Sequence, residues 1–183
     1  HKIYGPKGTG ALVLDKRIEL KPLISGGSHE QGLRGGTENV AGIVGFGAAC
    51  ELAAQRTREL APRLAAMRDQ FERGIAGMGA AIFGAGAPRI PNTSYFAFPG
   101  IEGETLVIEL DKVGFAVASG AACSSANPEP SATLLAMGVA PEIARGAVRF
   151  SLGKDNEPSQ VEECLRALQG VFTRLKRLTA IAV

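Results

Sequence analysis

The segment "TSYFAFPGIEGETLVIELDKVGFAVAS" (residues 93–119) decides the fold class. It begins with "TSYFAF", whose aromatic and polar residues, bounded by Pro91 and Pro99, predict a strand. "EGETLVIELDKVG" then predicts a helix that Gly114 ends, and "FAVAS" predicts a second strand. A strand, a helix and a strand in direct succession indicate an α/β chain with helices packed on a sheet.

The same alternation continues on both sides of this segment. Upstream, a helix is expected with an apolar stripe, with Pro62 at its start or at a kink and Gly77 and Gly79 at its end. Its stripe consists of Leu60, Leu64, Met67, Phe71 and Ile75. Downstream, the expected order is a short helix over Ser131–Met137, a strand in "GAVRFSLG" and a last helix from about residues 156–158. This order is that of a small sheet covered by helices.

The first third of the chain has a different pattern. Glycine-rich loops surround one short apolar run, "GALVL" (residues 10–14), which predicts a buried strand. Thr37 is expected to cap a helix from Glu38 to about Gln55, with its apolar residues on one face. These residues are Val40, Ile43, Val44, Gly47, Ala48 and Leu52. A boundary near residues 55–59 would divide the chain into domains 1–57 and 58–183.

Composition excludes several classes of protein. Of the 183 residues 45% are hydrophobic and 21% charged, as in a globular chain with a core. The net charge of +2 is too small to predict nucleic acid or an anionic membrane as a partner, and no apolar run is long enough to span a bilayer. Three widely spaced cysteines form neither a disulfide framework nor a metal-binding pattern, which indicates a reducing, cytoplasmic compartment.

Two glycine-rich segments contain the first candidate site residues. Lys2, before a turn of Gly and Pro, could form a Schiff base with a carbonyl cofactor, although most lysines are solvated surface charges. The glycines nearby do not fit a phosphate-binding P-loop, which needs Gly-Lys-Ser/Thr. Arg34 and Thr37 stand before the expected helix and could bind an anion. The alternative is a connector with Thr37 as an ordinary cap.

Two further residues stand out in the second half. Arg149 interrupts an apolar strand pattern, which fits either a guanidinium that pairs with a carboxylate or an edge or half-exposed strand. Cys123 lies among Gly, Ala and Ser, whereas Cys50 and Cys164 lie in helical runs where cysteine behaves as a small hydrophobe. This contrast makes Cys123 the candidate reactive thiol.

Five motifs, in their order and spacing, resemble those of the cysteine desulfurases. They are "HKIYGPKGTGAL", "GGSHEQGLRGGTENVAGIVGFGAA", "PNTSYFAFPGIEGETL", "ASGAACSSANPEPSATLLAMG" and "VRFSLG". These enzymes depend on pyridoxal 5'-phosphate and belong to the class V aminotransferase family. The segment "AACSSANPEPS" is similar to the long catalytic loop of the group that supplies iron–sulfur scaffold proteins.

The resemblance implies an architecture and a cofactor site. The chain is expected to be the C-terminal half of a fold type I transferase, with the end of the large domain followed by the small α/β (α+β) domain. Lys2 matches the lysine that holds the cofactor covalently, and His1 the neighbour that helps to hold its phosphate. Arg34 and Thr37 match residues that reach the phosphate of the partner subunit. Relatives often carry Ser where this chain has Gly35.

The resemblance also implies substrate residues and a reaction. Arg149 matches the arginine that pairs with the substrate carboxylate, and Asn92 an asparagine near the substrate. Cys123 matches the nucleophile that takes sulfur from L-cysteine, leaving L-alanine and a persulfide. The expected partners are L-cysteine and a scaffold or other sulfur-acceptor protein, in a homodimer without nucleic acid or membrane.

Two alternatives remain beside this hypothesis. One keeps the fold but changes the chemistry, to a selenocysteine lyase or another lyase of the same superfamily. The other is a non-catalytic interaction module. The ring-stacking residue, the aspartate for the ring nitrogen and the main phosphate loop lie upstream of the lysine in this family. The chain alone is therefore expected to bind pyridoxal phosphate poorly.

Overall fold

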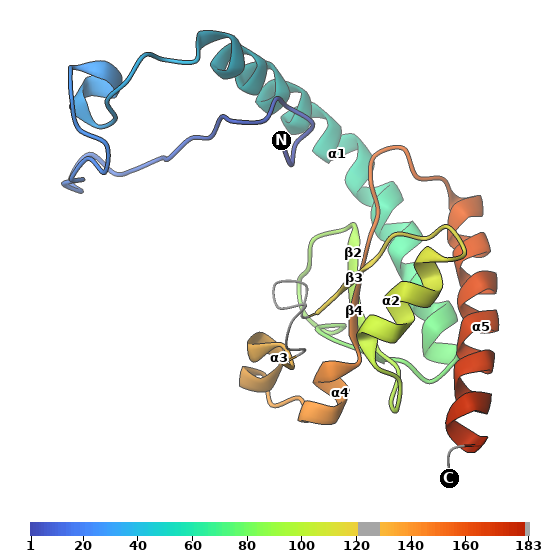
Figure 1. Ribbon diagram of the computed structural model, residues 1–183. Helices are drawn as coiled ribbons and strands as arrows, with labels where there is room; N and C mark the ends of the chain where they lie inside the picture. Colours follow the sequence, from blue (N-terminus) through green and yellow to red (C-terminus); the bar gives the residue numbers. More distant parts are fainter. Residues whose placement is uncertain (121–128, 182–183) are drawn as a thin grey trace. The chain divides into compact units, whose positions relative to one another are not determined.

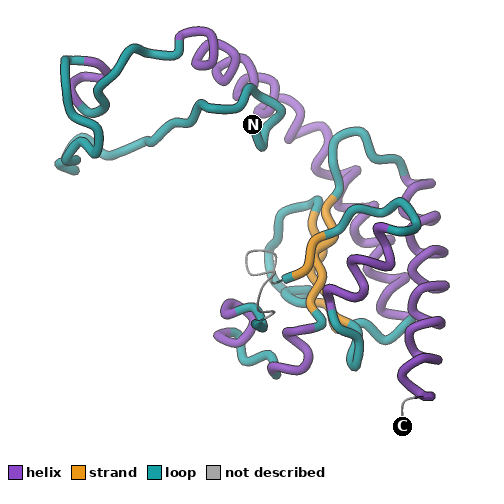
Figure 2. The backbone as a smooth tube through the Cα atoms, in the orientation of Figure 1, coloured by secondary structure: helices purple, strands orange, loops and turns teal. Residues whose placement is uncertain are grey.

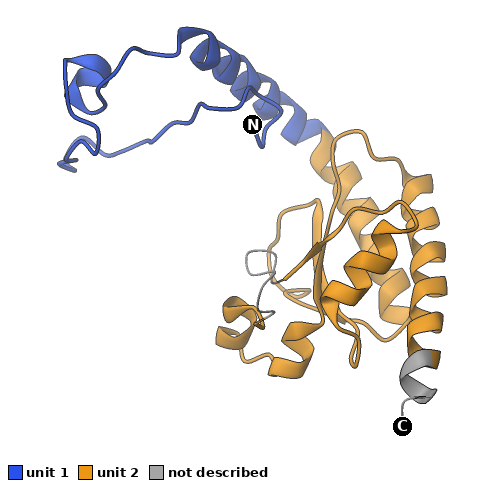
Figure 3. Cartoon of the chain, in the orientation of Figure 1, with its two compact units in different colours: residues 1–59 blue, residues 60–183 orange. Residues whose placement is uncertain are grey.

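The computed structural model describes residues 1–120 and 129–181, with side chains as far as residue 177 (Figure 1). Cys123 therefore lies outside the described residues. The chain divides into two compact units, His1–Glu59 and Leu60–Val183 (Figure 3). The longest element, helix α1 (Val40–Gly77), contributes its first half to one unit and its second half to the other.

The second unit contains a four-stranded antiparallel sheet with the order β1-β2-β4-β3 (Figure 2). Its strands are β1 (Ala81–Ile82), β2 (Thr93–Ala97), β3 (Ala118–Ser119) and β4 (Ala147–Ser151). β2 and β4 are the long central strands, and the strand expected in "FAVAS" is reduced to the two residues of β3. The mixed helix and strand fold expected from the sequence is confirmed, although β1 was not predicted.

One face of the sheet carries the hydrophobic core. Phe96 of β2 and Val148 of β4 are paired in the register and almost fully buried beneath α1, α2 (Gly103–Asp111) and α5 (Pro158–Ile181). Figure 1 shows α2 and α5 on this side of the sheet. Phe71 of α1 stacks on Phe150 with ring centroids 3.9 Å apart. Burial of these apolar side chains is the main stabilising contribution in this unit.

The opposite face of the sheet is only partly covered. α3 (Ala132–Ala136) and α4 (Pro141–Arg145) form a small apolar cluster there, with Leu134, Ala144 and Ala147 buried. The rest of this face carries Thr93 and Tyr95 of β2 opposite Ser151 and Arg149 of β4. α4 was missed from the sequence, although Pro141 at its first turn is a known start signal.

Helix α1 differs from the two helices that the sequence predicted. It runs without a break through Pro62, so the expected helix start there was wrong. Proline costs a backbone hydrogen bond inside a helix, but Leu64 and Met67 directly after it are buried in the core, which favours continuation. The helix ends as predicted, because Gly79 takes a positive φ of 87° and donates to Ala76 O.

The start of α1 also needs a correction. The Asn39 side chain accepts a hydrogen bond from Gly42 N at 3.1 Å, which is the contact of an N-cap residue. Asn39 therefore caps this helix instead of Thr37, which is exposed. Asparagine is as good a cap as threonine, so the sequence pattern alone did not separate the two.

The first unit lacks the buried strand that "GALVL" predicted. Residues 10–14 form no strand, and Leu12 and Val13 are 71% and 93% exposed. A strand is stable only when another strand pairs with it, and the described residues of this unit contain none. The apolar stripe predicted at the start of α1 is present, but Val40 and Val44 are 65% and 66% exposed.

Candidate functional site

Lys2 lies in a tight turn at the start of the first unit. Tyr4 N donates to His1 O at 3.1 Å, and Tyr4 takes a φ of 65°, a conformation that non-glycine residues rarely adopt. The chain after the turn lies close to α1, since a Cβ on Gly5 would come within 3.0 Å of Ala49 Cβ. Lys2 itself is exposed. The structure thus holds the Lys2 backbone in a constrained turn with its side chain accessible.

The loop that carries Arg34 is built on close backbone contacts. Gly35 is buried and donates to Ile24 O at 2.8 Å, and a Cβ on Gly35 would come within 2.6 Å of Gly26 O. A side chain at this position therefore does not fit the loop as it stands, which explains glycine there. The Arg34 guanidinium donates to Gly35 O at 2.7 Å, and both Arg34 and Thr37 are exposed.

These first-unit residues fit the groups that pyridoxal phosphate presents. The exposed Lys2 offers a primary amine, which is the partner that an aldehyde requires. Arg34 offers a guanidinium and Thr37 a hydroxyl, both of which suit a phosphate. One N–H of the Arg34 guanidinium is bonded to Gly35 O in its own loop, and its other N–H groups could donate to an anion.

Arg149 lies at the centre of the open sheet face. β4 is an interior strand, paired with β2 on one side and β3 on the other, so the edge-strand interpretation was wrong. The half-exposed sheet explains the residue, since Arg149 is exposed between Tyr95 and Ala118 in the register. Among the described residues no carboxylate forms an ion pair with it. The guanidinium of Arg149 thus lies on an accessible face of the sheet, and its backbone is held in an interior strand.

Asn92 precedes β2 and ties it to the end of β4. Its Nδ2 donates to Leu152 O at 2.9 Å, and Leu152 N donates to Asn92 O at 2.8 Å. The side-chain amide thus extends the β2–β4 ladder by one rung. This contact gives Asn92 a structural role in addition to the substrate contact expected from the sequence.

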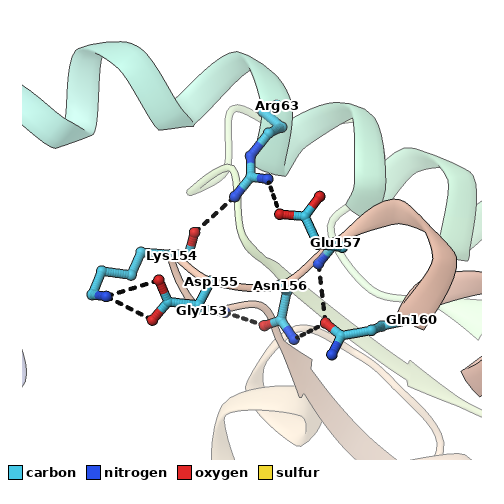
Figure 4. Close-up of polar contacts among 7 residues, drawn as sticks. All are labelled: Arg63, Gly153, Lys154, Asp155, Asn156, Glu157 and Gln160. Atoms are coloured by element: carbon cyan, nitrogen blue, oxygen red, sulfur yellow. Dashed lines mark hydrogen bonds and ion pairs between the residues drawn. The ribbon is translucent and has the colours of Figure 1, made fainter.

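The connection that follows β4 is held in place by polar contacts (Figure 4). Arg63 of α1 donates to Lys154 O at 2.7 Å and to Glu157 Oε1 at 3.0 Å. Gln160 Oε1 accepts from Glu157 N at 3.0 Å, a side-chain cap on the start of α5. These contacts hold the chain at Lys154 and Glu157, five and eight residues after Arg149.

A buried ion pair holds the segment before β2. Arg89 donates to both carboxylate oxygens of Glu72 on α1, at 2.7 and 2.9 Å. Burial is the largest single influence on the pKa of Glu72 and raises it, but the hydrogen bonds to Glu72, chiefly from Arg89, together with the positive charges of Arg89 and Arg68 outweigh burial, so the pKa lies below its ordinary value. Arg68 adds a hydrogen bond to Ile90 O at 3.0 Å. α1 therefore positions the approach to Asn92.

The thiols differ in their surroundings. Cys164 is buried in the core, as expected for a small hydrophobe, and burial raises the pKa of its thiol to about 12. Cys50 is exposed, so its interpretation as a packed residue was wrong for this chain. Residues 121–128, which include Cys123, are not described. Before them, Gly120 donates to Ala147 O at 2.8 Å, and shortly after them Ser131 caps α3.

Two classes of site are not found in the described part of the chain. No group of three or more His, Cys, Asp or Glu side chains there could hold a metal ion. Within the same residues, none of the helices combines the length and apolar character that a membrane span requires.

The aminotransferase class-V family matches residues 1–164, and the chain belongs to this family. Its architecture is that of a fragment of a fold type I, pyridoxal-phosphate-dependent transferase.

Similar curated proteins carry the name cysteine desulfurase. One from Bradyrhizobium diazoefficiens is 44% identical over 177 residues, which are 96% of this chain and 45% of the relative. Cysteine desulfurase NifS from Azotobacter vinelandii is 39% identical over 98% of this chain and 45% of its own length. The chain thus spans about half the length of these relatives.

Solved structures show the same relationship. A NifS-like protein aligns with a TM-score of 0.84 and 36% identity, over 94% of this chain and 44% of that one. A NifS-like protein from Rickettsia africae aligns with a TM-score of 0.75 and 27% identity, over 85% of this chain and 41% of that one.

Proposed function

We propose that this chain is the C-terminal portion of a cysteine desulfurase. The observation that carries the proposal is the match, over nearly the whole chain, to enzymes that bear this name at 39–44% identity. The exposed Lys2 in its constrained turn and the exposed Arg149 on the open sheet face are of the residue types that the reaction requires.

The proposed domains follow the same relationship. Residues 1–57 would be the end of the cofactor-binding large domain, with the helix that links the two domains. Residues 58–183 would be the small domain that carries the Cys123 segment. The division of the chain between Glu59 and Leu60 supports this boundary.

We assign the cofactor contacts to the first unit. Pyridoxal phosphate, when bound, supplies an electron sink for the bond cleavage. Lys2 would bind its aldehyde carbon through Nζ and His1 would contact its phosphate, while Arg34 and Thr37 would contact the phosphate of the cofactor in the partner subunit. Once substrate has replaced Lys2, the free amine would move the substrate α-proton.

We assign the substrate contacts and the nucleophile to the second unit. Arg149 would bind the carboxylate of L-cysteine with its planar guanidinium, and Asn92 would lie near the substrate. The Cys123 thiolate would then attack the substrate sulfur, so that an S–S bond forms on Cys123 as the substrate C–S bond breaks. The electron pair of the C–S bond stays with the carbon, which is protonated to give L-alanine. Cysteine and a thiol thus yield alanine and a persulfide without an external oxidant.

The partners are proposals of the same kind. A persulfide on Cys123 would pass its outer sulfur to an iron–sulfur scaffold or another acceptor, as the names NifS and IscS among the relatives suggest. The complete enzyme would be a homodimer in the cytoplasm. Arg34 and Thr37 would then contribute to the phosphate site of the partner subunit.

The test uses the complete enzyme, in which this chain follows the N-terminal portion that its relatives carry. Cys123→Ser should abolish sulfide release from L-cysteine while the absorbance of the bound cofactor persists. Lys2→Ala should lose both, because it removes the amine that is assigned to the aldehyde. Cys50→Ser is the matched control and should keep full activity. Undiminished activity in Cys123→Ser would refute the assignment of the nucleophile.

A second test uses the chain alone. The chain mixed with pyridoxal phosphate should show neither stable cofactor absorbance nor sulfide release, because it spans about half of its relatives. Addition of the N-terminal portion should restore both. A stable cofactor complex with turnover in the chain alone would contradict the proposed division of the site.

A further inference from the structure

We propose that Tyr95 is a positioning residue for the sulfur-transfer step, an inference that rests on the proposed function. Tyr95 supports both described flanks of the segment that carries Cys123, and it lies opposite Arg149 on the same face of the sheet. From the sequence, Tyr95 was expected only to lie in a strand.

The backbone of Tyr95 is held firmly. It lies in the middle of β2, paired with Arg149 of β4, and its carbonyl accepts a hydrogen bond from Phe83 N at 2.8 Å. Its ring meets the Phe83 ring edge-on, with centroids 5.3 Å apart. A residue on an interior strand that packs against another aromatic ring has little freedom to move.

The ring of Tyr95 supports the C-terminal flank of the Cys123 segment. It packs against the buried cluster of Leu134, Ala144 and Ala147 on the open side of the sheet. Leu134 belongs to α3, which begins at Ala132 after the Ser131 cap. The position of α3 therefore depends on the Tyr95 ring.

The hydroxyl of Tyr95 meets the N-terminal flank. Gly120 continues the β3–β4 pairing by donating to Ala147 O, and it lies so close to Tyr95 Oη that a Cβ added at Gly120 would overlap that atom. Only a residue without a side chain fits between the strand and the hydroxyl. One side chain thus sets the spacing of both flanks.

This arrangement has a consequence for the reaction. The thiol must reach a substrate whose carboxylate is bound by Arg149, the cross-strand neighbour of Tyr95. Because Tyr95 fixes the flanks relative to Arg149, it should affect the rate of sulfur transfer more than the binding of substrate or cofactor. A displacement of about 1 Å at a reacting group can slow a reaction roughly 100-fold.

The experiment measures the rate at which sulfur appears on Cys123 in one turnover of the complete enzyme, by quenching and mass spectrometry. Tyr95→Leu and Gly120→Ala should each slow this rate about 10-fold to 100-fold. Cofactor absorbance and the KM for L-cysteine should stay within about twofold. Tyr95→Phe keeps the ring that supports the C-terminal flank and loses only the hydroxyl, so it should slow the rate less than Tyr95→Leu does.

The double variant Tyr95→Phe with Gly120→Ala gives the decisive comparison. Because Tyr95→Phe removes the Oη atom that the added Cβ would overlap, the double variant should recover most of the rate that Gly120→Ala loses. The melting temperature of the chain itself should show the same recovery.

The outcomes separate the two proposals. A Tyr95→Leu enzyme that transfers sulfur at the unmodified rate would overturn the role of Tyr95 alone, as would a double variant no faster than Gly120→Ala. If the unmodified enzyme gains no sulfur on Cys123, the proposed function fails, and the role of Tyr95 fails with it.

Discussion

The two units of the chain are stabilised to very different degrees. In the second unit one face of the sheet and three helices bury one continuous apolar cluster, in which the Phe71 ring contacts those of Phe96 and Phe150. In the first unit glycine-rich loops surround one end of α1, and large apolar side chains such as Val13 and Val44 are exposed. Only the second unit has a core of its own.

The difference shows what each unit needs to function. The second unit has a sheet with helices packed on one face, which is an arrangement that buries a hydrophobic core. The first unit has the residue types of a cofactor site but exposes the apolar stripe that the sequence predicted on one face of its helix. We infer that its stripe and its "GALVL" run are covered by the N-terminal portion that the relatives carry. The predictions below test this contrast, from the largest expected effect to the smallest.

Hydrogen exchange should show the largest difference. Amides of β2 and β4 should exchange only through global unfolding, which costs about 5–15 kcal/mol in a typical domain, whereas amides of residues 1–36 should exchange at close to the unprotected rate. Addition of the N-terminal portion should slow exchange in residues 1–36 and leave β2 and β4 unchanged. Equal protection of the two units in the chain alone would break the comparison.

The two thiols that lie on helices should differ almost as much in their reactivity. Cys164 is buried with a pKa raised to about 12, while Cys50 is exposed. Burial therefore keeps Cys164 as the neutral thiol at neutral pH. Iodoacetamide should therefore label Cys50 rapidly and Cys164 only on unfolding, as peptide mass spectrometry can measure. Labelling of both at one rate would contradict the burial of Cys164.

Truncation of one apolar residue in each unit gives the next comparison. Phe71→Ala should lower the free energy of unfolding by about 3–5 kcal/mol, because it leaves a cavity beside Phe96 and Phe150. Val44→Ala, at a position 66% exposed, should change it by no more than about 0.5 kcal/mol. Urea denaturation measures both. A loss at Val44 as large as that at Phe71 would mean that the first unit has a core.

Removal of one ion pair in each unit should give the smallest difference in stability between the two units. Glu72→Gln should cost about 2 kcal/mol at neutral pH, because it weakens two charged hydrogen bonds to Arg89. The pKa of Glu72 is lowered in the folded chain, so its contribution is present above the ordinary value of 4.5 and is lost as the pH falls through the folded value. The difference between the unmodified chain and Glu72→Gln should therefore shrink in acid.

The matched control for this pair lies in the first unit. Arg17 also lowers the pKa of Asp15 through hydrogen bonds, but both side chains are largely exposed. Asp15→Asn should leave the unfolding curve unchanged at every pH, since exposed ion pairs contribute little. If the stability difference between the unmodified chain and Glu72→Gln did not vary with pH, the ion pair with Arg89 would not be the way in which Glu72 stabilises the fold.

Much of the second unit was predictable from its sequence. Strand β2, the positions of α2, α3 and α5, and helix ends at Gly79, Gly114 and Gly138 follow from periodicity and from glycines with positive φ. The errors have physical causes. The two-residue strand β1 and the five-residue helix α4 are too short to leave a periodic pattern, and packing in the core overrides the preference of Pro62.

The site was predictable only in part. Residue type and motif pointed to Lys2, Arg34, Thr37 and Arg149, and the structure shows each of them accessible. The sheet position of Arg149 was not predictable, because strand order is set by long-range pairing. Tyr95 was missed for a different reason. An aromatic residue in a strand is typical of a core, and only the coordinates show its contact with Gly120.

Mass spectrometry of the complete enzyme after one equivalent of L-cysteine gives the most direct measurement. We expect the peptide that contains Cys123 to gain the mass of one sulfur atom, with alanine released in equal amount and the Cys50 and Cys164 peptides unchanged. An unmodified Cys123 peptide in an enzyme that still releases sulfide would contradict the account.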